Sequence, residues 1–298
     1  MISRGALIAV LFVVELAVLG EMGVAIRGGE PAPWSGPRSS AEAASGPGLV
    51  EDGPHKIFDA AAHPALSVDI GYADLTIVTR NVSQIDVAVS KSTDFGFFRA
   101  KAPITAREDG ESIRISTSDG PGWSTGDDRM VTVVVPPQTQ VTVVKAGDVV
   151  ASGLRGEASL TSVGGGTITV EDYNGPALRV TSSDGLILLQ QVVAARLDAK
   201  SRNDRIEGTG LQVRDGTVQA DDRVTLGFAA GADTLVSAET NDGKINLAGF
   251  DPASSVAAAH KSGDDNDDSS SQTVRVGAGE GSLVVHSSDG NIDLTKEG

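Results

Sequence analysis

The chain has 298 residues, of which 40 are acidic and 24 basic, giving a formal net charge of −16. This excess of negative charge repels phosphate backbones, so we expect no nucleic-acid partner. There is no cysteine, which excludes disulfides, thiol catalysis and cysteine-ligated zinc. The length suits one large all-β domain or two smaller ones.

The N-terminal segment is strongly apolar. Residues 6–26, ALIAVLFVVELAVLGEMGVAI, would as a helix rising about 1.5 Å per residue span a hydrocarbon core of about 30 Å. Glu15, near the centre, costs about 2.5–3.5 kcal/mol, which large apolar side chains worth about 0.3–0.6 kcal/mol each offset. Residues 1–26 are therefore predicted to form a transmembrane anchor. The alternatives are a cleaved signal peptide, with Gly23 and Ala25 before the cut, and a buried or interfacial helix.

Both the anchor and the signal peptide place the rest of the chain on the extracytoplasmic side. We therefore expect a single-pass protein of the cell membrane with its C-terminal domain outside, or a secreted protein after cleavage. Residues 27–55 are rich in Pro, Gly, Ser and Ala and too poor in apolar residues to pack. They are predicted to be a flexible linker, and residues 56–298 a separate domain.

The apolar period changes to two from about residue 56. The segments LSVDIGYADLTIVT, IDVAVS, SIRIST, MVTVVVPP and QVTVVK alternate between apolar and polar residues or run apolar between turn residues, as strands do. VVAARLDAK at 192–200 comes nearest to a helical period, but the strand pattern on both sides of it favours a strand. The domain is therefore predicted to be all-β.

A polar corner recurs along this domain. A Gly or Asp stands two residues before an aliphatic residue with a period of about 19 residues. These residues are Gly147, Gly166, Gly185, Asp204, Asp222, Gly243 and Gly290. The last interval is longer, because an insertion with the acidic loop 261–271, KSGDDNDDSSS, precedes the final unit.

Such a period predicts a single-chain β-solenoid, in which equivalent residues of successive coils stack at about 4.8 Å. The corner SSDG occurs at 182–185 and again at 287–290. Small hydroxyl residues fit the inside of a tight bend and can hydrogen-bond to the backbone there. The Gly or Asp is expected to supply a positive φ. The alternative is that Asp-Gly closes antiparallel hairpins of a meander or sandwich.

The stretch MVTVVVPPQTQVTVVKAGDVVASGLRGEASLTSVGGGTITVEDYNGPALRVTSSDGLILLQ resembles the bacterial adhesin-like repeat domain, a family of unknown function. The resemblance covers roughly residues 56–295 and includes LSVDIGYADLTIV as a first unit. It implies an adhesin-like β-solenoid in the cell envelope, since members are often attached to a membrane segment.

No metal or cofactor site is predicted. The acidic cluster Asp264, Asp265, Asp267 and Asp268 lacks the later Glu of an EF-hand, because Arg275 stands at the twelfth position, and it is interpreted as a disordered loop. The glycines 164–166 match neither a phosphate loop nor a calcium-binding nonapeptide and are interpreted as corner residues.

One pattern favours an enzyme. Asp-Gly pairs recur, and an acidic row along one edge, with calcium and a basic residue acting as the base, would suit a polysaccharide-acting enzyme on a β-helix scaffold. The acids are Asp52, Asp109, Asp119, Asp184, Asp215, Asp242 and Asp289, and the candidate bases are Arg179, Lys200, Arg202, Arg205 and Arg223. Turns also favour Asp for local hydrogen bonding, which is the simpler interpretation.

The histidines and one phenylalanine cluster match no catalytic or metal-binding pattern. His55, His63, His260 and His286 have no ligand spacing and are interpreted as surface residues. Phe95, Phe97 and Phe98 are expected to cap the open end of the solenoid, or else to form an exposed patch for a partner.

Together these patterns predict a non-catalytic, membrane-tethered extracytoplasmic recognition protein, an adhesin or an envelope-stress module. We expect no catalytic residues, no cofactor and no metal, and a partner that is an envelope protein, a glycan or a peptide. The alternatives are the polysaccharide-acting enzyme and a scaffold partner of an envelope-stress signalling system.

Overall fold

The computed structural model describes residues 48–49, 55–60, 65–91, 104–117, 129–251, 255–256 and 269–297. Throughout these ranges the regular structure is β-strand, and 21 strands form one hydrogen-bonded sheet, which confirms the all-β prediction. No helix in these ranges is long and apolar enough to cross a membrane. The predicted anchor 1–26, the acidic cluster 264–268 and the phenylalanines 95–98 lie outside the described residues, as does most of the segment 27–55.

The strands, in chain order, are as follows. The first seven are β1 (Gly48–Leu49), β2 (Lys56–Asp59), β3 (Ala65–Asp69), β4 (Asp74–Thr79), β5 (Gln84–Lys91), β6 (Ile104–Asp109) and β7 (Ser112–Thr117). The next seven are β8 (Arg129–Val135), β9 (Gln140–Ala146), β10 (Val149–Ser152), β11 (Ala158–Ser162), β12 (Ile168–Ser182), β13 (Ile187–Ser201) and β14 (Ile206–Ala220). The last seven are β15 (Val224–Phe228), β16 (Thr234–Thr240), β17 (Ile245–Ala248), β18 (Ser255–Val256), β19 (Ser270–Val276), β20 (Gly281–Ser287) and β21 (Ile292–Lys296).

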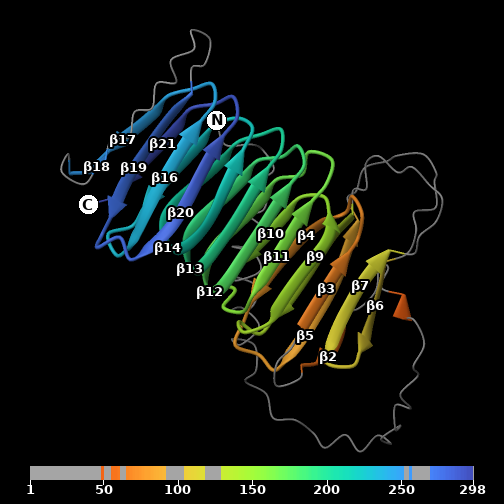
Figure 1. Ribbon diagram of the computed structural model, residues 1–298. Helices are drawn as coiled ribbons and strands as arrows, with labels where there is room; N and C mark the ends of the chain where they lie inside the picture. The colour runs from red at the N-terminus through yellow and green to blue at the C-terminus, as the bar shows by residue number, and fades with distance from the viewer. Residues whose placement is uncertain are drawn as a thin grey trace, which may run out of the picture. The chain divides into compact units, whose positions relative to one another are not determined.

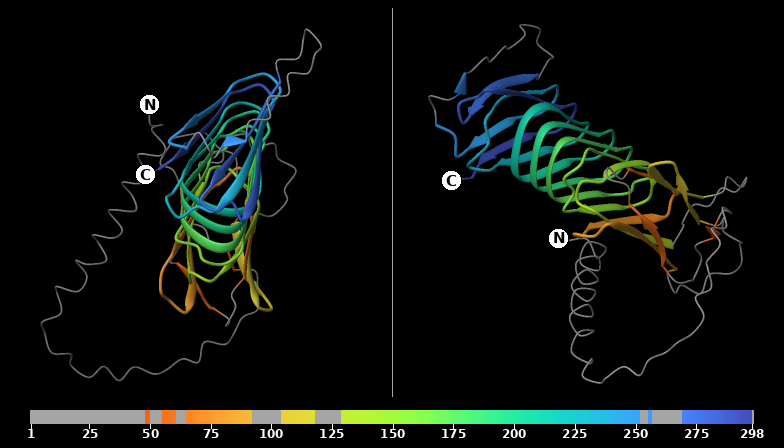
Figure 2. Two further views of the ribbon diagram at one scale, coloured as in Figure 1. Left: turned by 60° about the vertical axis from the view of Figure 1, so that its left-hand side comes forward. Right: turned by 90° about the horizontal axis from the view of Figure 1, so that it is seen from below.

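The middle of the domain is a parallel β-solenoid (Figures 1 and 2). The long strands β12, β13 and β14 pair in parallel, with Ile168 opposite Ile187 and Ile187 opposite Ile206. Each coil has one strand on each of two faces. Face 1 holds β7, β3, β9, β11, the second halves of β12 to β14, β20, β16 and β19. Face 2 holds β8, β4, β10, the first halves of β12 to β14, β15, β21 and β17.

The parallel pairing on both sides of Asp184-Gly185 rules out a hairpin at that corner. The segment with the nearest helical period, 192–200, lies within β13, as the strand pattern predicted. A hairpin does occur at another Asp-Gly pair. Strands β6 and β7 are antiparallel, with Asp109 opposite Ser112 and the turn at Gly110 and Glu111, so the alternative interpretation is correct at that one place.

The last coil of the chain is not the last coil of the stack. Strand β20 pairs in parallel with β14 on one side and β16 on the other, and β21 lies in the same way between β15 and β17. The C-terminal coil 281–296 is therefore inserted between coils 215–228 and 234–248 (Figure 1). The sequence predicted that coils stack at a constant period but did not predict this exchange of order. The period gives the spacing of the repeats along the chain, not their order in the stack.

The N-terminal end is closed in the same manner. Strand β3 lies between β7 and β9, and β4 between β8 and β10, so coil 65–79 is inserted between the later segments 112–135 and 140–152. Antiparallel strands continue the sheet past the outermost coils: β6 on β7 and β5 on β8 at this end, and β19 on β16 at the other. Antiparallel strands of this kind leave fewer open parallel edges.

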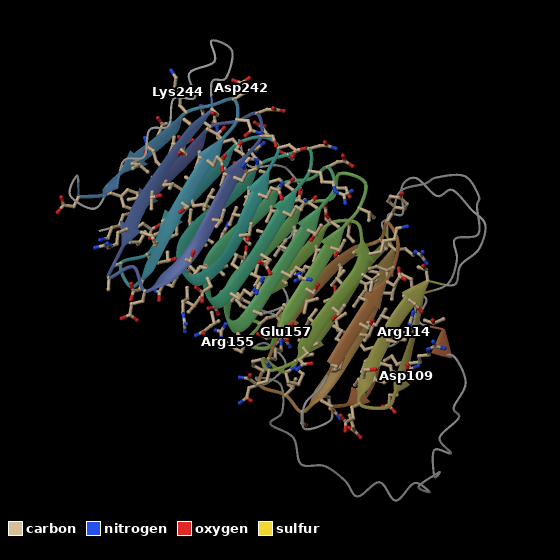
Figure 3. The ribbon with its side chains drawn as sticks, in the orientation of Figure 1. Asp109, Arg114, Arg155, Glu157, Asp242 and Lys244 are labelled. Carbon is tan, nitrogen blue, oxygen red and sulfur yellow. The ribbon has the colours of Figure 1, made fainter. Side chains whose placement is uncertain are left out.

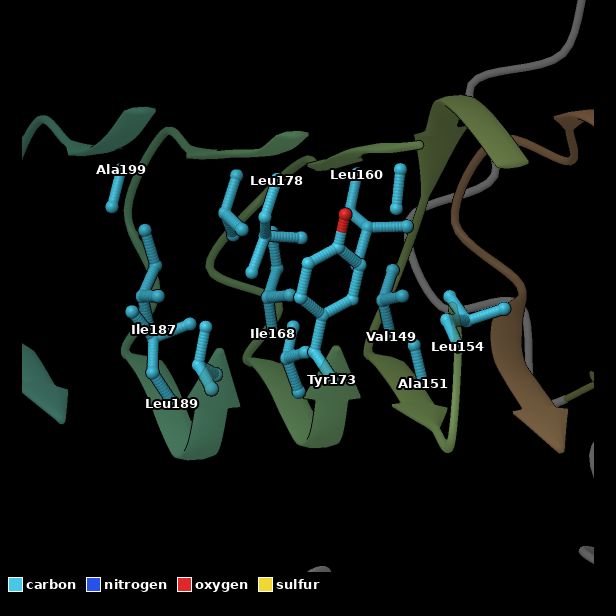
Figure 4. Close-up of a cluster of buried hydrophobic side chains, with 14 of the residues drawn as sticks. Val149, Ala151, Leu154, Leu160, Ile168, Tyr173, Leu178, Ile187, Leu189 and Ala199 are labelled. Carbon is cyan, nitrogen blue, oxygen red and sulfur yellow. The ribbon is translucent and has the colours of Figure 1, made fainter. Parts of the chain in front are cut away.

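The core is a set of aliphatic ladders between the two faces (Figure 4). Ile168, Ile187, Ile206 and Leu197 are each 0% exposed, and Figure 4 shows Ile168 facing Leu178 across the interior. Inward positions alternate with outward positions along each strand, as in the predicted assignment of Leu178 and Ile187. Full burial of each such side chain contributes about 1.5–3 kcal/mol, so the ladders are the main source of stability.

A ladder of buried hydroxyl groups lines the inside of the SSDG corner. Ser162 Oγ donates to the Gly166 carbonyl at 2.8 Å, and Ser182 Oγ accepts from the Gly185 amide at 2.9 Å. Ser287 Oγ accepts from the Gly290 amide at 3.0 Å in the second copy. The predicted role of these hydroxyls in satisfying the backbone of the bend is confirmed.

The predicted role of the corner glycines was wrong. None of Gly147, Gly166, Gly185, Gly243 and Gly290 has a positive φ. They are glycines because the next coil is too close: a Cβ on Gly185 would lie 2.1 Å from the Gly166 carbonyl oxygen, and one on Gly166 would lie 2.4 Å from that of Gly147. The corner requires the absence of a side chain, not a left-handed backbone.

One periodic set of left-handed residues lies at the opposite corner, whereas Gly71, Gly164 and Gly165, with φ of 71°, 63° and 84°, lie at the corners equivalent to SSDG in their own coils. Gly153, Asp172, Gln191 and Gly210 have φ of 77°, 50°, 54° and 65°, and they follow one another at the same period of about 19 residues. The sequence conceals this corner because only two of the four residues are glycine, although Asp and Gln tolerate a positive φ less readily.

One aromatic ring completes this second corner. Tyr173 is 0% exposed, and its hydroxyl donates to the carbonyl of Ala177 at 2.6 Å and lies 3.0 Å from the carbonyl of Gly156. Burial raises the pKa of Tyr173 to about 12. The neutral phenol is thus a structural part of the bend.

Candidate recognition surface

The predicted row of carboxylates forms only in part. Asp184, Asp242 and Asp289 occupy equivalent positions at the SSDG corner, and the amide of Asp289 donates to the carbonyl of Asp221 beside it. Asp109 is in the β6–β7 hairpin and Asp215 is within β14, away from this corner. Asp52 and Asp119 lie outside the described residues.

The candidate bases do not join these carboxylates. Arg179 pairs with Asp198 at 3.6 Å, Arg205 with Glu207 at 2.7 Å, and Arg223 with Asp293 at 3.8 Å. Lys200 and Arg202 are exposed and form no ion pair with a described residue. Among the described residues, none of these candidate bases forms an ion pair with an acid of the predicted row, as the acid–base pair of a polysaccharide-acting enzyme would require.

Acidic and histidine side chains do not form a metal centre in the described ranges, where no three His, Cys, Asp or Glu residues could hold an ion. His55 pairs with Asp86 at 3.0 Å near the N-terminal end, and His286 is half-buried on β20. His63 and His260 lie outside the described residues. A shallow pocket at the N-terminal end is lined by carboxylates and apolar groups: Asp59, Ala60, Ile85, Glu108, Gly110, Glu111 and Ile113.

A β-bulge on face 1 interrupts the regular stack. Val68 pairs with Val143 and Asp69 with Lys145, so Val144 is an extra residue of β9. The register with β11 shifts at the same place. The bulge leaves Val144 53% exposed. Bulges re-aim side chains and are more frequent beside functional sites than elsewhere in sheets.

The corner that follows the bulge is short. Asp69 pairs with Lys145 before the corner, and Leu75 pairs with Val149 after it. The corner between these pairs consists of residues 146–148 in this coil but of residues 70–74 in the preceding coil. The ring of Tyr72, from the preceding coil, lies across this short corner, since a Cβ on Gly164 of the next coil would lie 2.8 Å from Tyr72 Cε1. Part of the ring thus fills space, but Tyr72 remains 42% exposed and is the only exposed Tyr, Phe or Trp in the described part of the chain.

Two charged side chains, those of Lys145 and Asp148, lie near the ring of Tyr72. Lys145 Nζ lies 5.2 Å from the centroid of Tyr72, within the range of a cation–π interaction. Asp148 is held beside it, because its Oδ1 accepts from the amide of Thr167 at 2.7 Å. Gly165 leaves open space next to the ring. We refer to Tyr72, Val144, Lys145, Gly164 and Gly165 as the bulge corner.

The bulge corner thus combines an exposed ring, an apolar side chain and an ammonium group. These residue types supply contact area at low conformational cost in recognition surfaces. The chemistry is that of non-covalent binding.

Residues 63–295, nearly the whole of the described domain, match Toastrack DUF4097.

The chain belongs to the Toastrack DUF4097 family. The resemblance to an adhesin-like repeat domain of unknown function is thereby confirmed. No curated protein matches the chain.

Two solved structures are similar to the Toastrack chain. A proposed cell adhesion protein from Clostridium sporogenes is 14% identical, with 82% of this chain and 99% of that chain covered and a TM-score of 0.34. A proposed adhesin from Bacteroides fragilis is 10% identical, with 82% of this chain and 96% of that chain covered and a TM-score of 0.39.

Sequence reasoning did not find the bulge corner of this Toastrack domain. The sequence pattern places Tyr72 in the first repeat unit and Lys145 in a strand, and gives neither a functional role. One signal was available: the distance from the strand to its corner glycine is shorter at Gly147 than at Gly166, so the coil must compress there.

Proposed function

We propose that this protein is a non-catalytic, membrane-tethered recognition protein whose domain 56–298 lies outside the cytoplasm and acts as an adhesin or an envelope-stress module. Its ligand is an envelope glycan, peptide or protein. The bulge corner is the observation that carries the proposal, because an exposed ring and an exposed valine are not needed to close a solenoid.

The scaffold supports this role physically. Hydrogen-bonded parallel strands on both sides hold Tyr72 and Lys145 at fixed spacing. A preorganised contact surface loses little conformational entropy on binding, and this favours affinity. Exposed aromatic residues are also the residues that most often dominate binding energy.

The binding test uses purified full-length protein in detergent micelles, with purified cell-wall glycan and an envelope protein fraction as separate probes. We expect Tyr72→Ala to weaken binding to one probe by at least about tenfold, as truncation of a central aromatic contact does. Val284→Ala is the matched control, since Val284 is also an exposed apolar residue (45%) but lies on β20, far along the stack. Equal binding by the wild type and Tyr72→Ala would refute the proposed site.

Protease treatment of intact cells, or of spheroplasts where an outer membrane is present, tests the location. Digestion of the domain 56–298 in the membrane fraction from outside supports a tethered extracytoplasmic protein, and release into the medium supports cleavage. Protection until lysis would place the domain in the cytoplasm and contradict the proposal.

A further inference from the structure

Two arginines lie directly opposite each other on the outer side of face 1, near its N-terminal end. Strands β6 and β7 pair with Arg107 opposite Arg114. Both side chains are exposed. Directly paired residues have Cα atoms about 4.5–5.5 Å apart and project to the same side of the sheet, so the two guanidinium groups share one patch of surface (Arg114 is labelled in Figure 3).

Neither arginine has an ion pair with a described residue. Most other arginines of the faces and corners do have one, namely Arg155, Arg179, Arg196, Arg205, Arg214 and Arg223. Arg80, Arg202 and Arg275 also have no ion pair with a described residue, but among the described strand pairs only Arg107 and Arg114 place one arginine opposite another. A carboxylate opposite either arginine would form an ion pair in place of this repulsion.

The pairing is unfavourable for folding. Like charges directly opposite each other destabilise a sheet, so this pair lowers the stability of the hairpin that closes the N-terminal end. Features that reduce stability without a structural gain are typical of functional sites. A bound anion would remove the repulsion.

The surroundings suit an oxyanion. Arg114 is also opposite Ser67 of β3, whose side chain lies between it and the rest of face 1. Thr105 and Ser112, each two residues from one of the arginines, are uncharged, and their hydroxyls donate to the carbonyls of Ser116 and Asp109, so the guanidinium groups supply the donors for an anion. The acids closest on these strands are Glu108 and Asp109 on β6 and Asp69 on β3, and none of the three forms an ion pair with Arg107 or Arg114.

We propose that Arg107 and Arg114 together bind phosphate groups carried by a polymer. The planar guanidinium fork matches phosphate geometry and donates two hydrogen bonds at once, so two forks side by side can hold one phosphate or two consecutive ones. A polymer fits because the pair sits at one end of a long face, along which further groups of the polymer can lie. The net charge of −16 does not prevent this, because salt screens charges beyond about 8–10 Å and the two guanidinium groups act at contact distance. This site deepens the proposed recognition function and rests on it for the nature of the ligand.

The test measures the affinity of full-length protein in detergent for fluorescently labelled short-chain polyphosphate, with inorganic phosphate and neutral dextran as comparison probes. We expect polyphosphate to bind more tightly than either. Arg107→Gln and Arg114→Gln should each weaken it by about tenfold, which corresponds to one charge-assisted contact. Arg179→Gln and Arg196→Gln are the matched controls, because these arginines are exposed on the same face and already paired, and they should change affinity less than twofold.

Thermal unfolding separates binding from structure. Without ligand, Arg107→Gln should melt at the same temperature as the wild type or higher, because the repulsion is removed. A lower melting temperature together with lost binding would make the pair structural and overturn the proposal. So would an unchanged affinity in both variants, or polyphosphate binding no tighter than inorganic phosphate.

The two proposals fail separately. If Tyr72→Ala abolishes envelope binding while the arginine variants bind polyphosphate normally, only the phosphate site is wrong. If the arginine variants lose polyphosphate but Tyr72→Ala binds the envelope probes like the wild type, the bulge corner is wrong and the phosphate site stands.

Discussion

Replacing Ser182 by alanine removes one rung of the buried hydroxyl ladder while leaving the shape of the corner almost unchanged. Ser182 Oγ accepts from the Gly185 amide at 2.9 Å and lies 3.0 Å from Ser162 Oγ. Ser162 Oγ retains the Gly166 carbonyl as a partner at 2.8 Å. The variant therefore leaves one buried group, the Gly185 amide, without a hydrogen-bond acceptor.

An unsatisfied buried donor costs about 1–3 kcal/mol, so we expect the free energy of unfolding to fall by about 2 kcal/mol. In a domain of this size that lowers the melting temperature by about 4–8 °C. Urea and thermal unfolding followed by circular dichroism measure both quantities.

The matched control is Ser183→Ala, at the neighbouring residue, which is half-buried and has no side-chain hydrogen bond to a described residue. Its stability should stay within about 0.5 kcal/mol of the wild type. If Ser182→Ala were as stable as Ser183→Ala, the hydroxyl ladder would not hold the bend, and our explanation of the repeated SSDG corner would be refuted.

Three other predictions concern the same scaffold. Gly185→Ala places a Cβ 2.1 Å from the Gly166 carbonyl oxygen, and the forced separation of two coils should cost about 3 kcal/mol in urea unfolding; a cost below 1 kcal/mol would contradict the packing argument. The pKa of Tyr173 is raised to about 12, so near pH 10 the unfolded chain loses the phenol proton while the folded protein keeps it. The free energy of unfolding should therefore fall by up to about 3 kcal/mol between pH 10 and 12. Tyr173→Phe should remove that part of the fall. Deletion of residues 281–297 removes four fully buried aliphatic side chains, worth about 6–12 kcal/mol, and should abolish cooperative unfolding; a cooperative transition would show that coil 234–248 can close on 215–228 directly.

The regular part of the fold follows from local sequence. Alternation of apolar and polar residues identified the strands, and the period of about 19 residues placed Gly166, Gly185 and Gly290 at one corner. Both signals depend on neighbours in the chain or on a repeated spacing, which a single sequence displays directly.

Features that depend on contacts between distant segments could not be predicted. The insertion of coil 281–296 ahead of coil 234–248 leaves no trace in the period, because both copies carry the same Asp-Gly-x-Ile pattern. The predicted positive φ of Gly185 was wrong for the same reason. Glycine is required there because the carbonyl of another coil leaves no room for a Cβ, and this contact joins segments that are distant in the chain.

The candidate sites follow the same division. The Asp-Gly pattern suggested an acidic row, but three-dimensional register was needed to show that Asp109 and Asp215 lie elsewhere. Tyr72 became a candidate only through its exposure and its contact with Lys145 across coils. Arg107 and Arg114 became a pair only through the hairpin register.

The insertion of both terminal coils also affects which strands unfold locally and when the domain can finish folding. Chain ends usually fray first and exchange their amide hydrogens fastest. Here strands β3 and β20 each have a parallel partner on both sides, so their amides should exchange as slowly as those of β13. During synthesis the slot between β14 and β16 stays vacant until residues 281–296 have left the ribosome. The domain can therefore reach its native state only after residues 281–296 have been translated.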